Sequence, residues 1–341
     1  MEILGLREEE LREKLIEMGE QGFRASQVFD WIYKGAEGFD EMKNLPKALR
    51  EKLMEGFDVG LPKVVAEQVS KEDGTRKYLL ELSDGNAIES VFMKYHYGNS
   101  ICVSSQAGCR MGCRFCASTI DGLERNLTAG EILGQVLRVE REAGEKINHI
   151  VVMGSGEPFD NYENLKRFLE LATDPKTLGL SSRNITVSTC GVIPGIERFA
   201  DDFPQVNLAI SLHASEDESR SEIMPINKKY PLKQLIEAAK VYTDKTHRRV
   251  SFEFTLVSGV NDSDEDAEKL VNLLKGMLCH VNIIPLNPVR EREYSTVNRE
   301  RAKAFAKILE DRGIPATVRR ELGGDIDGAC GQLRLSKKKS I

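Results

Sequence analysis

The sequence predicts an α/β protein built on a partial (β/α)6 barrel, with a small helical N-terminal domain and a short antiparallel β extension. Three observations carry this prediction. From residue 101 onward, strand-like apolar runs alternate with helical stretches, which is typical of a parallel sheet with helical crossovers. Residues 62–106 contain β-rich runs broken by Asp-Gly pairs. Residues 1–57 have helical periodicity.

The N-terminal region is expected to fold as a set of short helices. Apolar residues recur at helical spacing from Leu11, and Gly19 is placed to end that helix. Ser26 is expected to cap a second helix, and Pro46 to lie in the first turn of a third. We therefore predict a helical accessory domain over residues 1–60.

The next segment is predicted to be an antiparallel meander. Its three β-rich runs are VVAEQVS, RKYLLELS and AIESVFMKY, and they are separated by Asp73-Gly74 and Asp84-Gly85. Asp-Gly between two β runs is a strong hairpin signal, because both residues accept the positive φ angles of a tight turn. Residues 61–94 are expected to form this extension.

The core, predicted over residues 95–325, repeats a strand–helix unit. Its strand-like runs span residues 101–106, 149–154, 184–188, 206–212, 250–256 and 280–286, with 315–319 as a candidate seventh. Helical stretches lie at about 128–143, 161–172, 193–200, 232–243, 264–274 and 298–312. Thr128 and Glu131 form a capping-box pattern at the first of them. A doubly wound sheet is the alternative architecture.

Composition places the chain among ordinary globular proteins. It has 341 residues, of which 40% are hydrophobic and 30% charged, enough to bury a core. The N-terminus is charged from its second residue, and no apolar run approaches a membrane span. These features predict a soluble, cytoplasmic protein with no membrane partner. The net charge of −6 taken alone argues against nucleic acid.

The sharpest motif is the run Cys109-Arg-Met-Gly-Cys113-Arg-Phe-Cys116. In a reduced compartment, clustered cysteines indicate metal binding more often than disulfides. A structural zinc site needs four protein ligands, and no nearby Cys or His supplies the fourth. A [4Fe–4S] cluster with three cysteine ligands leaves one iron open to another ligand. Three purely structural cysteines are the other interpretation.

Small or polar residues follow several of the predicted strands. In barrels of this kind, functional groups gather at the carboxyl ends of the strands. The residues in question are Gly156, Glu157, Ser188, Ser211, Leu212, His213 and Asn287. Each one alone would be an ordinary loop or core residue; together, on one rim with the cysteine run, they predict a binding wall.

Two further cysteines lie outside the cluster motif. Cys102 lies on the first core strand, and Cys330 lies in GDIDGACGQL near the C-terminus. Residue chemistry alone leaves both open to interpretation as inert core thiols. Cys190 and Cys279 are expected to be structural.

The longer motifs resemble the RlmN/Cfr group of radical SAM RNA methyltransferases over essentially the whole chain. The matching stretches are CVSSQAGCRMGCRFCAS, RNLTAGEI, VVMGSGEPFDN, AISLHASEDESRSEIMPINKKYPL, SGVNDS, HVNIIPLNP and GDIDGACGQL. The resemblance implies a partial radical SAM barrel that methylates an adenosine of 23S rRNA. RlmN members methylate C2 and also act on the adenosine 3′ of the anticodon in some tRNAs, whereas Cfr members methylate C8. Gly156-Glu157-Pro158 favours RlmN.

The resemblance also implies roles for individual residues. Cys109, Cys113 and Cys116 would hold a [4Fe–4S] cluster whose fourth iron binds S-adenosylmethionine (SAM). The residues of the binding wall would contact SAM. Cys330, in a C-terminal segment over residues 326–341, would carry the methyl group, and Cys102 would resolve the protein–RNA adduct through a disulfide. Glu89 would be the proton acceptor; an exposed strand carboxylate is its alternative interpretation.

The implied partners are 23S rRNA, tRNA and an electron donor such as flavodoxin or ferredoxin, with no DNA. The acidic total does not exclude RNA, because phosphate contact depends on local charge. Residues 219–250 hold a basic excess, from Arg220, Lys228, Lys229, Lys233, Lys240, Lys245, Arg248 and Arg249. Two rival functions remain at this point: a radical SAM enzyme acting on protein or a small molecule, and a non-catalytic iron–sulfur or zinc RNA adaptor.

Overall fold

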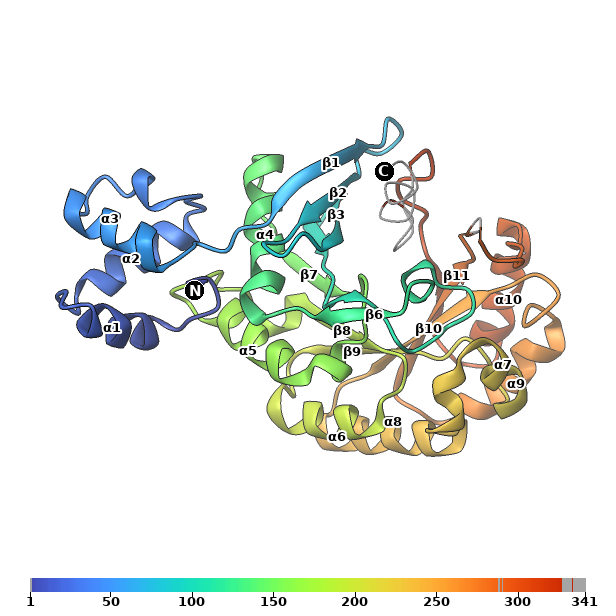
Figure 1. Ribbon diagram of the computed structural model, residues 1–341. Coiled ribbons are helices and arrows are strands. Elements are labelled where there is room, and N and C mark those ends of the chain that lie inside the picture. The colour runs from blue at the N-terminus through green and yellow to red at the C-terminus, as the bar shows by residue number, and fades with distance from the viewer. Residues whose placement is uncertain (1, 288, 290, 327–332, 334–341) are drawn as a thin grey trace.

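The computed structural model describes residues 2–287, 289, 291–326 and 333 (Figure 1). Its centre is a mixed sheet of ten strands, in the order β1-β2-β3-β4-β7-β8-β9-β10-β11-β12. The strands from β4 to β12 pair in parallel, while β1 to β4 pair antiparallel. The described strands do not close into a barrel, since β1 and β12 end the order. The predicted partial barrel with an antiparallel extension is confirmed.

Three helices make up the N-terminal region: α1 (Glu8–Glu17), α2 (Arg24–Tyr33) and α3 (Lys47–Gly56). Gly19, with φ of +78°, follows the end of α1 as predicted. The prediction that Ser26 caps the second helix is wrong. The helix begins two residues earlier, with Phe23 at the N-cap, and its buried residues begin with Ala25, so burial rather than a side-chain cap determines where it begins.

The antiparallel extension consists of β1 (Lys63–Val69), β2 (Arg76–Glu81) and β3 (Ala87–Tyr95). The two Asp-Gly pairs lie in the connections between these strands, as the sequence predicts. β3 then pairs with β4 (Gly98–Cys102), the first strand of the parallel part. The meander is therefore continuous with the core sheet.

The parallel part continues through β7 (His149–Val152), β8 (Ile185–Thr189), β9 (Asn207–Ser211), β10 (Val250–Leu256), β11 (Cys279–Pro285) and β12 (Ala316–Val318). The last of these confirms the candidate seventh strand. The main helices between them are α4 (Ala129–Ala143), α5 (Tyr162–Thr173), α6 (Ile193–Asp202), α8 (Leu232–Thr246), α9 (Asp264–Leu274) and α10 (Arg299–Asp311). The predicted capping box of Thr128 and Glu131 is present at α4.

Two features of the rim are not apparent from sequence periodicity. A small two-stranded sheet joins β5 (Gln106–Gly108) to β6 (Leu123–Asn126) and encloses the cysteine run. A short helix, α7 (Asp217–Ile223), lies between β9 and α8. Both are too short to show a repeating apolar pattern. Both adjoin the carboxyl ends of the parallel strands, where the site is expected.

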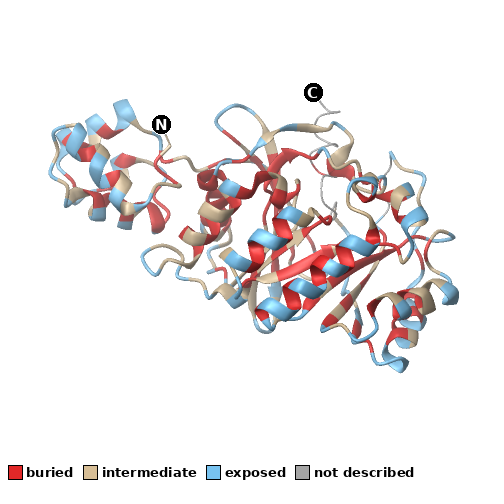
Figure 2. Cartoon of the chain, turned by 90° about the horizontal axis from the view of Figure 1, so that it is seen from below, coloured by how far each residue is buried: buried red, intermediate tan, exposed pale blue. Residues whose placement is uncertain are grey.

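The helices bury one side against the sheet and expose the other, as their burial colours show (Figure 2). The N-terminal helices share one apolar core with the sheet and its helices. Charged contacts add to this docking: Arg138 of α4 donates to the Glu37 carboxylate and, at 2.8 Å, to the carbonyl oxygen of Pro62. Among the described residues, no helix is long and apolar enough to cross a membrane.

Candidate active site

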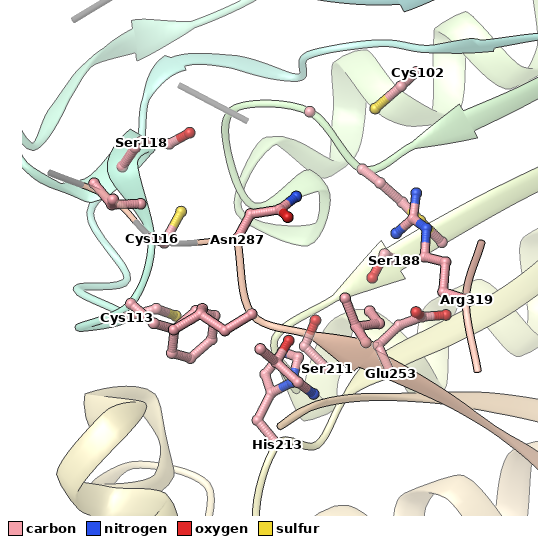
Figure 3. A pocket seen from close by; sticks show the side chains of 18 of the residues that line it. Cys102, Cys113, Cys116, Ser118, Ser188, Ser211, His213, Glu253, Asn287 and Arg319 are labelled. Atoms are coloured by element: carbon pink, nitrogen blue, oxygen red, sulfur yellow. The ribbon is translucent and has the colours of Figure 1, made fainter. Parts of the chain in front are cut away.

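A cavity of about 540 Å³ opens at the carboxyl ends of the parallel strands. Its wall unites most of the residues singled out from the sequence: Cys102, Cys109, Cys113, Cys116, Gly156, Glu157, Ser188, Ser211, His213 and Asn287. Figure 3 shows Cys113 and Cys116 on one side of this cavity and Cys102 on the other. Six chain segments thus contribute these residues to one site.

The cysteine loop is held in shape by its own backbone and by neighbouring hydroxyls. Thr119 Oγ1 donates to the carbonyl oxygens of Cys113 and Cys116, at 3.0 Å each. Gly108 precedes the loop with φ of +79°, and a Cβ there would lie 2.0 Å from the carbonyl oxygen of Gly122. Only glycine fits such an approach, so the β5–β6 hairpin depends on this residue.

The three loop thiols suit a metal centre. Burial is the main cause that raises the pKa of Cys109 to about 12 and that of Cys113 well above its ordinary value. The thiolate forms that bind metal therefore need positive charge beside them. Among the described residues, no three Cys, His, Asp or Glu side chains converge on one ion position. An iron–sulfur cubane does not need that convergence, since each thiolate binds a different iron.

Glu157 offers a buried carboxylate to this cavity. Its Oε1 accepts from the backbone N–H of Phe159 at 3.0 Å, and its Oε2 from that of Cys190 at 2.7 Å. Burial nevertheless raises its pKa. Gly156, with φ of +108°, leads into it, and a Cβ there would lie 2.6 Å from Gln106. The ammonium group of a bound ligand would supply a positive counter-charge to this buried carboxylate.

His213 is fixed as a neutral ring. Burial, with a smaller contribution from Arg220, lowers its pKa to about 3. Its Nδ1 accepts from the backbone N–H of Thr255 at 2.9 Å, so the neutral ring carries its proton on Nε2. The ring meets Phe115 edge-on, with centroids 4.9 Å apart. His213 therefore joins the rim to the cysteine loop and offers a donor rather than a charge.

Other predicted residues lie elsewhere. Leu212 is buried in the core rather than in the cavity wall. Glu89 is 4% exposed and lies 3.0 Å from Lys77 Nζ, which overturns the interpretation of Glu89 as an exposed strand carboxylate. It is not in the cavity wall, although Val91 and Met93 on the same face of β3 are.

The cysteines outside the loop take different places. Cys330 lies outside the described residues, and no disulfide joins any two of the six cysteines that the structure describes. The pairing of Cys102 with Cys330 stays a prediction. Cys190 lines the cavity and packs beside Cys113, whereas Cys279 begins β11 at the opposite end of the sheet.

Glu253 and Arg319 are among the wall residues that the sequence analysis did not single out. Glu253 of β10 is buried, its pKa is raised by burial, and Asn282 donates to its Oε1 at 2.9 Å. Arg319 follows β12 and also lines the cavity. The available signal was an acid in the middle of the predicted core strand VSFEFTL. Burying a carboxylate in such a strand costs free energy unless the carboxylate has partners.

The basic segment over residues 219–250 is not one surface. Arg220 is 0% exposed, so it cannot reach a phosphate. The exposed Lys228 lies at the site end of α8, whereas Arg249 immediately precedes β10 at the opposite end. Charges that are neighbours in the chain are separated because α8 runs the length of the sheet between them.

Comparisons with known proteins agree with this geometry. The family model described as Radical SAM superfamily matches residues 103–274. The model described as Ribosomal RNA large subunit methyltransferase N-terminal domain matches residues 1–59. The first range contains the cysteine loop and the cavity-lining ends of β7 to β10, and the second contains the three N-terminal helices.

Relatives extend the match to nearly the full chain. A probable dual-specificity RNA methyltransferase RlmN of Clostridium perfringens (strain SM101 / Type A) is 56% identical, covering 99% of this chain and 98% of its own. One of Clostridium botulinum (strain Hall) is 53% identical, covering 98% of each. The crystal structure of a radical SAM methyltransferase from Sphaerobacter thermophilus is 46% identical, with a TM-score of 0.93 over 97% of this chain and 98% of that one. The chain is therefore a methyltransferase that belongs to the radical SAM superfamily and, within it, to the RlmN family.

Proposed function

We propose that the chain methylates C2 of an adenosine in 23S rRNA, and of the adenosine 3′ of the anticodon in certain tRNAs. The observation that carries this proposal is the place of Cys102. It comes seven residues before the cysteine loop, yet it faces the same cavity. A second reactive thiol in the cavity suits a reaction that passes through a covalent protein adduct. The dual specificity named for the relatives supports the choice of substrates.

We further propose that Cys109, Cys113 and Cys116 hold a [4Fe–4S] cluster, with SAM on the fourth iron. Three thiols on one hydrogen-bonded loop are the donor set that this arrangement needs. When bound, the two cofactors supply an electron and a carbon radical that activate a C–H bond. This chemistry suits adenine C2, whose C–H is neither acidic nor nucleophilic.

The cavity wall would orient SAM. Glu157 would accept hydrogen bonds from its ammonium group, since both carboxylate oxygens are already fixed by backbone donors. Ser188, Ser211 and Asn287 offer small polar groups along the same wall. Gly156 would allow close approach, and His213 would donate from Nε2. Leu212 would act only from the core, by holding the neighbouring His213 in place.

Two cysteines and a carboxylate would handle the RNA. Cys330 would accept the methyl group as a nucleophile and carry it to the adenine. Cys102 would then attack the Cys330 sulfur, which releases the methylated base and leaves a disulfide to be reduced. Glu89 would take the C2 proton, and the neighbouring Lys77 ammonium would balance its charge.

The cycle would depend on outside partners. Because the thiols must be reduced again and the cluster must receive an electron, the proposed setting is the cytoplasm, with a donor such as flavodoxin or ferredoxin. The RNA would enter through the open cavity mouth, where Arg319 and Arg320 lie. DNA is not among the proposed partners.

Nucleoside mass spectrometry of treated 23S rRNA fragments and tRNA tests the proposal. We expect 2-methyladenosine in both; 8-methyladenosine would instead indicate a Cfr-type reaction, and methylation of neither RNA would refute the proposal. Cys102→Ala is expected to accumulate a protein–RNA adduct on a denaturing gel. Cys330→Ala should form neither adduct nor product, and Cys279→Ala serves as the control because that thiol lies at the opposite end of the sheet.

A further inference from the structure

Arg220 is the largest fully buried side chain of the described structure, with 0% of its surface exposed. It belongs to the short helix α7, beside the site end of the parallel strands. Burial lowers the pKa of Arg220, but an arginine side chain is not deprotonated in proteins, so the buried guanidinium stays charged. The position of this charge therefore needs an explanation.

All the hydrogen-bond acceptors of Arg220 are neutral. Its Nε donates to the carbonyl oxygen of Leu212 at 3.0 Å, and its Nη1 to Asn227 Oδ1 at 2.8 Å. Its Nη2 donates to the carbonyl oxygens of Cys190 at 2.8 Å and Ser211 at 3.1 Å. These bonds fix the guanidinium to the ends of β8 and β9 without pairing its charge with a carboxylate.

No carboxylate among the described residues forms an ion pair with Arg220. Asp217 is bridged to it by Asn227, whose Nδ2 donates to Asp217 Oδ1 at 2.9 Å, and it also acts to raise the Arg220 pKa without forming an ion pair. The other deeply buried cation, Lys77, lies 3.0 Å from Glu89. Arg138, almost as buried, contacts two carboxylates, Glu37 and Glu142. Burying a cation without an ion-pair partner is costly, so negative charge that binds here would be stabilised.

The cysteine loop packs on the residues that hold this guanidinium. Cys190, whose carbonyl oxygen accepts from Arg220, packs beside Cys113 in a small apolar cluster. The N–H of Arg114 donates to the carbonyl oxygen of Ile223, at the end of α7, at 2.9 Å. The thiolates of a loaded cluster would bring negative charge to this place.

We propose that Arg220 is the built-in counter-charge of the iron–sulfur cluster and sets its reduction potential. The inference rests on the proposed assignment of Cys109, Cys113 and Cys116 as the ligands. One-electron reduction adds one negative charge to the cluster, so a fixed cation stabilises the reduced form more than the oxidised form. Arg220 is a positioning residue here, because it acts on the cluster from behind the loop and touches no substrate.

The test is an anaerobic redox titration of the cluster, followed by electron paramagnetic resonance, in reconstituted full-length protein. Arg220→Met removes the charge at similar volume, and Arg220→Lys keeps it. In Arg220→Met we expect the equilibrium constant for reduction to fall at least tenfold, which corresponds to about 59 mV for one electron. In Arg220→Lys it should stay within about threefold of the wild type, although the fixed hydrogen bonds are lost. Arg138→Met, a buried arginine of α4, is the matched control and should leave the potential unchanged.

The two Arg220 variants decide the proposal between them. An unchanged potential in Arg220→Met overturns it. If Arg220→Met does not hold a cluster, Arg220→Lys still decides: a tenfold fall in that variant means that geometry rather than charge sets the potential. The proposed function is tested separately, by iron content and RNA methylation of the wild type, so a failure there is not confused with a failure here.

Discussion

The buried ammonium of Lys77 and the buried guanidinium of Arg220 differ in how their charge is balanced. Lys77, on the antiparallel β2, lies against the carboxylate of Glu89 on β3. Arg220, at the ends of the parallel strands, donates only to neutral groups. The antiparallel extension therefore balances this buried charge with its own residues. On the cysteine side of the cavity, no described carboxylate forms an ion pair with the buried cation, and this is where we propose that the cluster binds.

The largest expected effect is on cluster binding at the cysteine loop. Cys113→Ala should lose nearly all of the roughly four irons of a bound cluster, because the remaining two thiols cannot hold it. Iron and sulfide content after anaerobic reconstitution measures this loss. The matched control is Cys279→Ala, a buried thiol at the opposite end of the sheet, which should load like the wild type. A Cys113→Ala protein with full iron would show that the cysteine loop does not hold the cluster, and the contrast with the antiparallel extension would be lost.

A change in the antiparallel extension should alter the stability of the fold rather than the binding of the cluster. Lys77→Met leaves Glu89 buried without its cation, and breaking a buried pair in this way costs about 3–5 kcal/mol. Urea denaturation measures the loss of unfolding free energy. The double variant Lys77→Met/Glu89→Leu removes both charges and should recover most of that loss. If the unfolding free energy of Lys77→Met lies within about 1 kcal/mol of the wild type, the antiparallel extension does not depend on the pair.

A smaller effect is expected on SAM binding. Glu157→Gln keeps the shape of the side chain but loses its charge, so it should weaken SAM binding by about 10- to 100-fold, the value of one charge-assisted hydrogen bond. Equilibrium dialysis of cluster-loaded protein measures it. Glu163→Gln, at a carboxylate 76% exposed on α5, is the control. Unchanged SAM affinity in Glu157→Gln would assign this carboxylate to the fold alone.

The sequence predicts most of this architecture because its signals are local. Asp84-Gly85 marks a hairpin, and Thr128 with Glu131 marks the start of α4, since turn and cap chemistry act over a few residues. The place of Glu157, shortly after a strand, is also predicted from a local signal, because the glycines beside it mark the end of the strand-like run. By contrast, Ser26 shows that a local cap signal yields to burial when the two compete.

Electrostatic partners could not be predicted in this way, because they come from separate elements. The sequence interpretation counts Arg220 among basic residues available to RNA, whereas the fold buries it behind the cysteine loop. The alternative interpretation likewise leaves Glu89 exposed, because nothing local shows that Lys77 of the neighbouring strand lies beside it. Burial and charge pairing depend on the folded chain, and both decide what a charged residue does.

The smallest expected effect concerns Glu253, a carboxylate of the parallel sheet whose pKa is raised by burial. Above that raised pKa the native state holds a buried charge, so stability should fall as pH rises through it and be fully regained below the ordinary value of 4.5. Glu253→Gln still accepts from Asn282 but cannot ionise. It should therefore be more stable than the wild type at pH 8, by about 1.4 kcal/mol for each pKa unit of elevation, and equal to it near pH 4. Urea denaturation at both pH values measures this difference, with Glu131→Gln as a contrasting variant that loses its ion pair with Arg125 and should be less stable at pH 8. Equal stability of Glu253→Gln and the wild type at pH 8 would mean that Glu253, like Glu89, has its charge balanced within the fold.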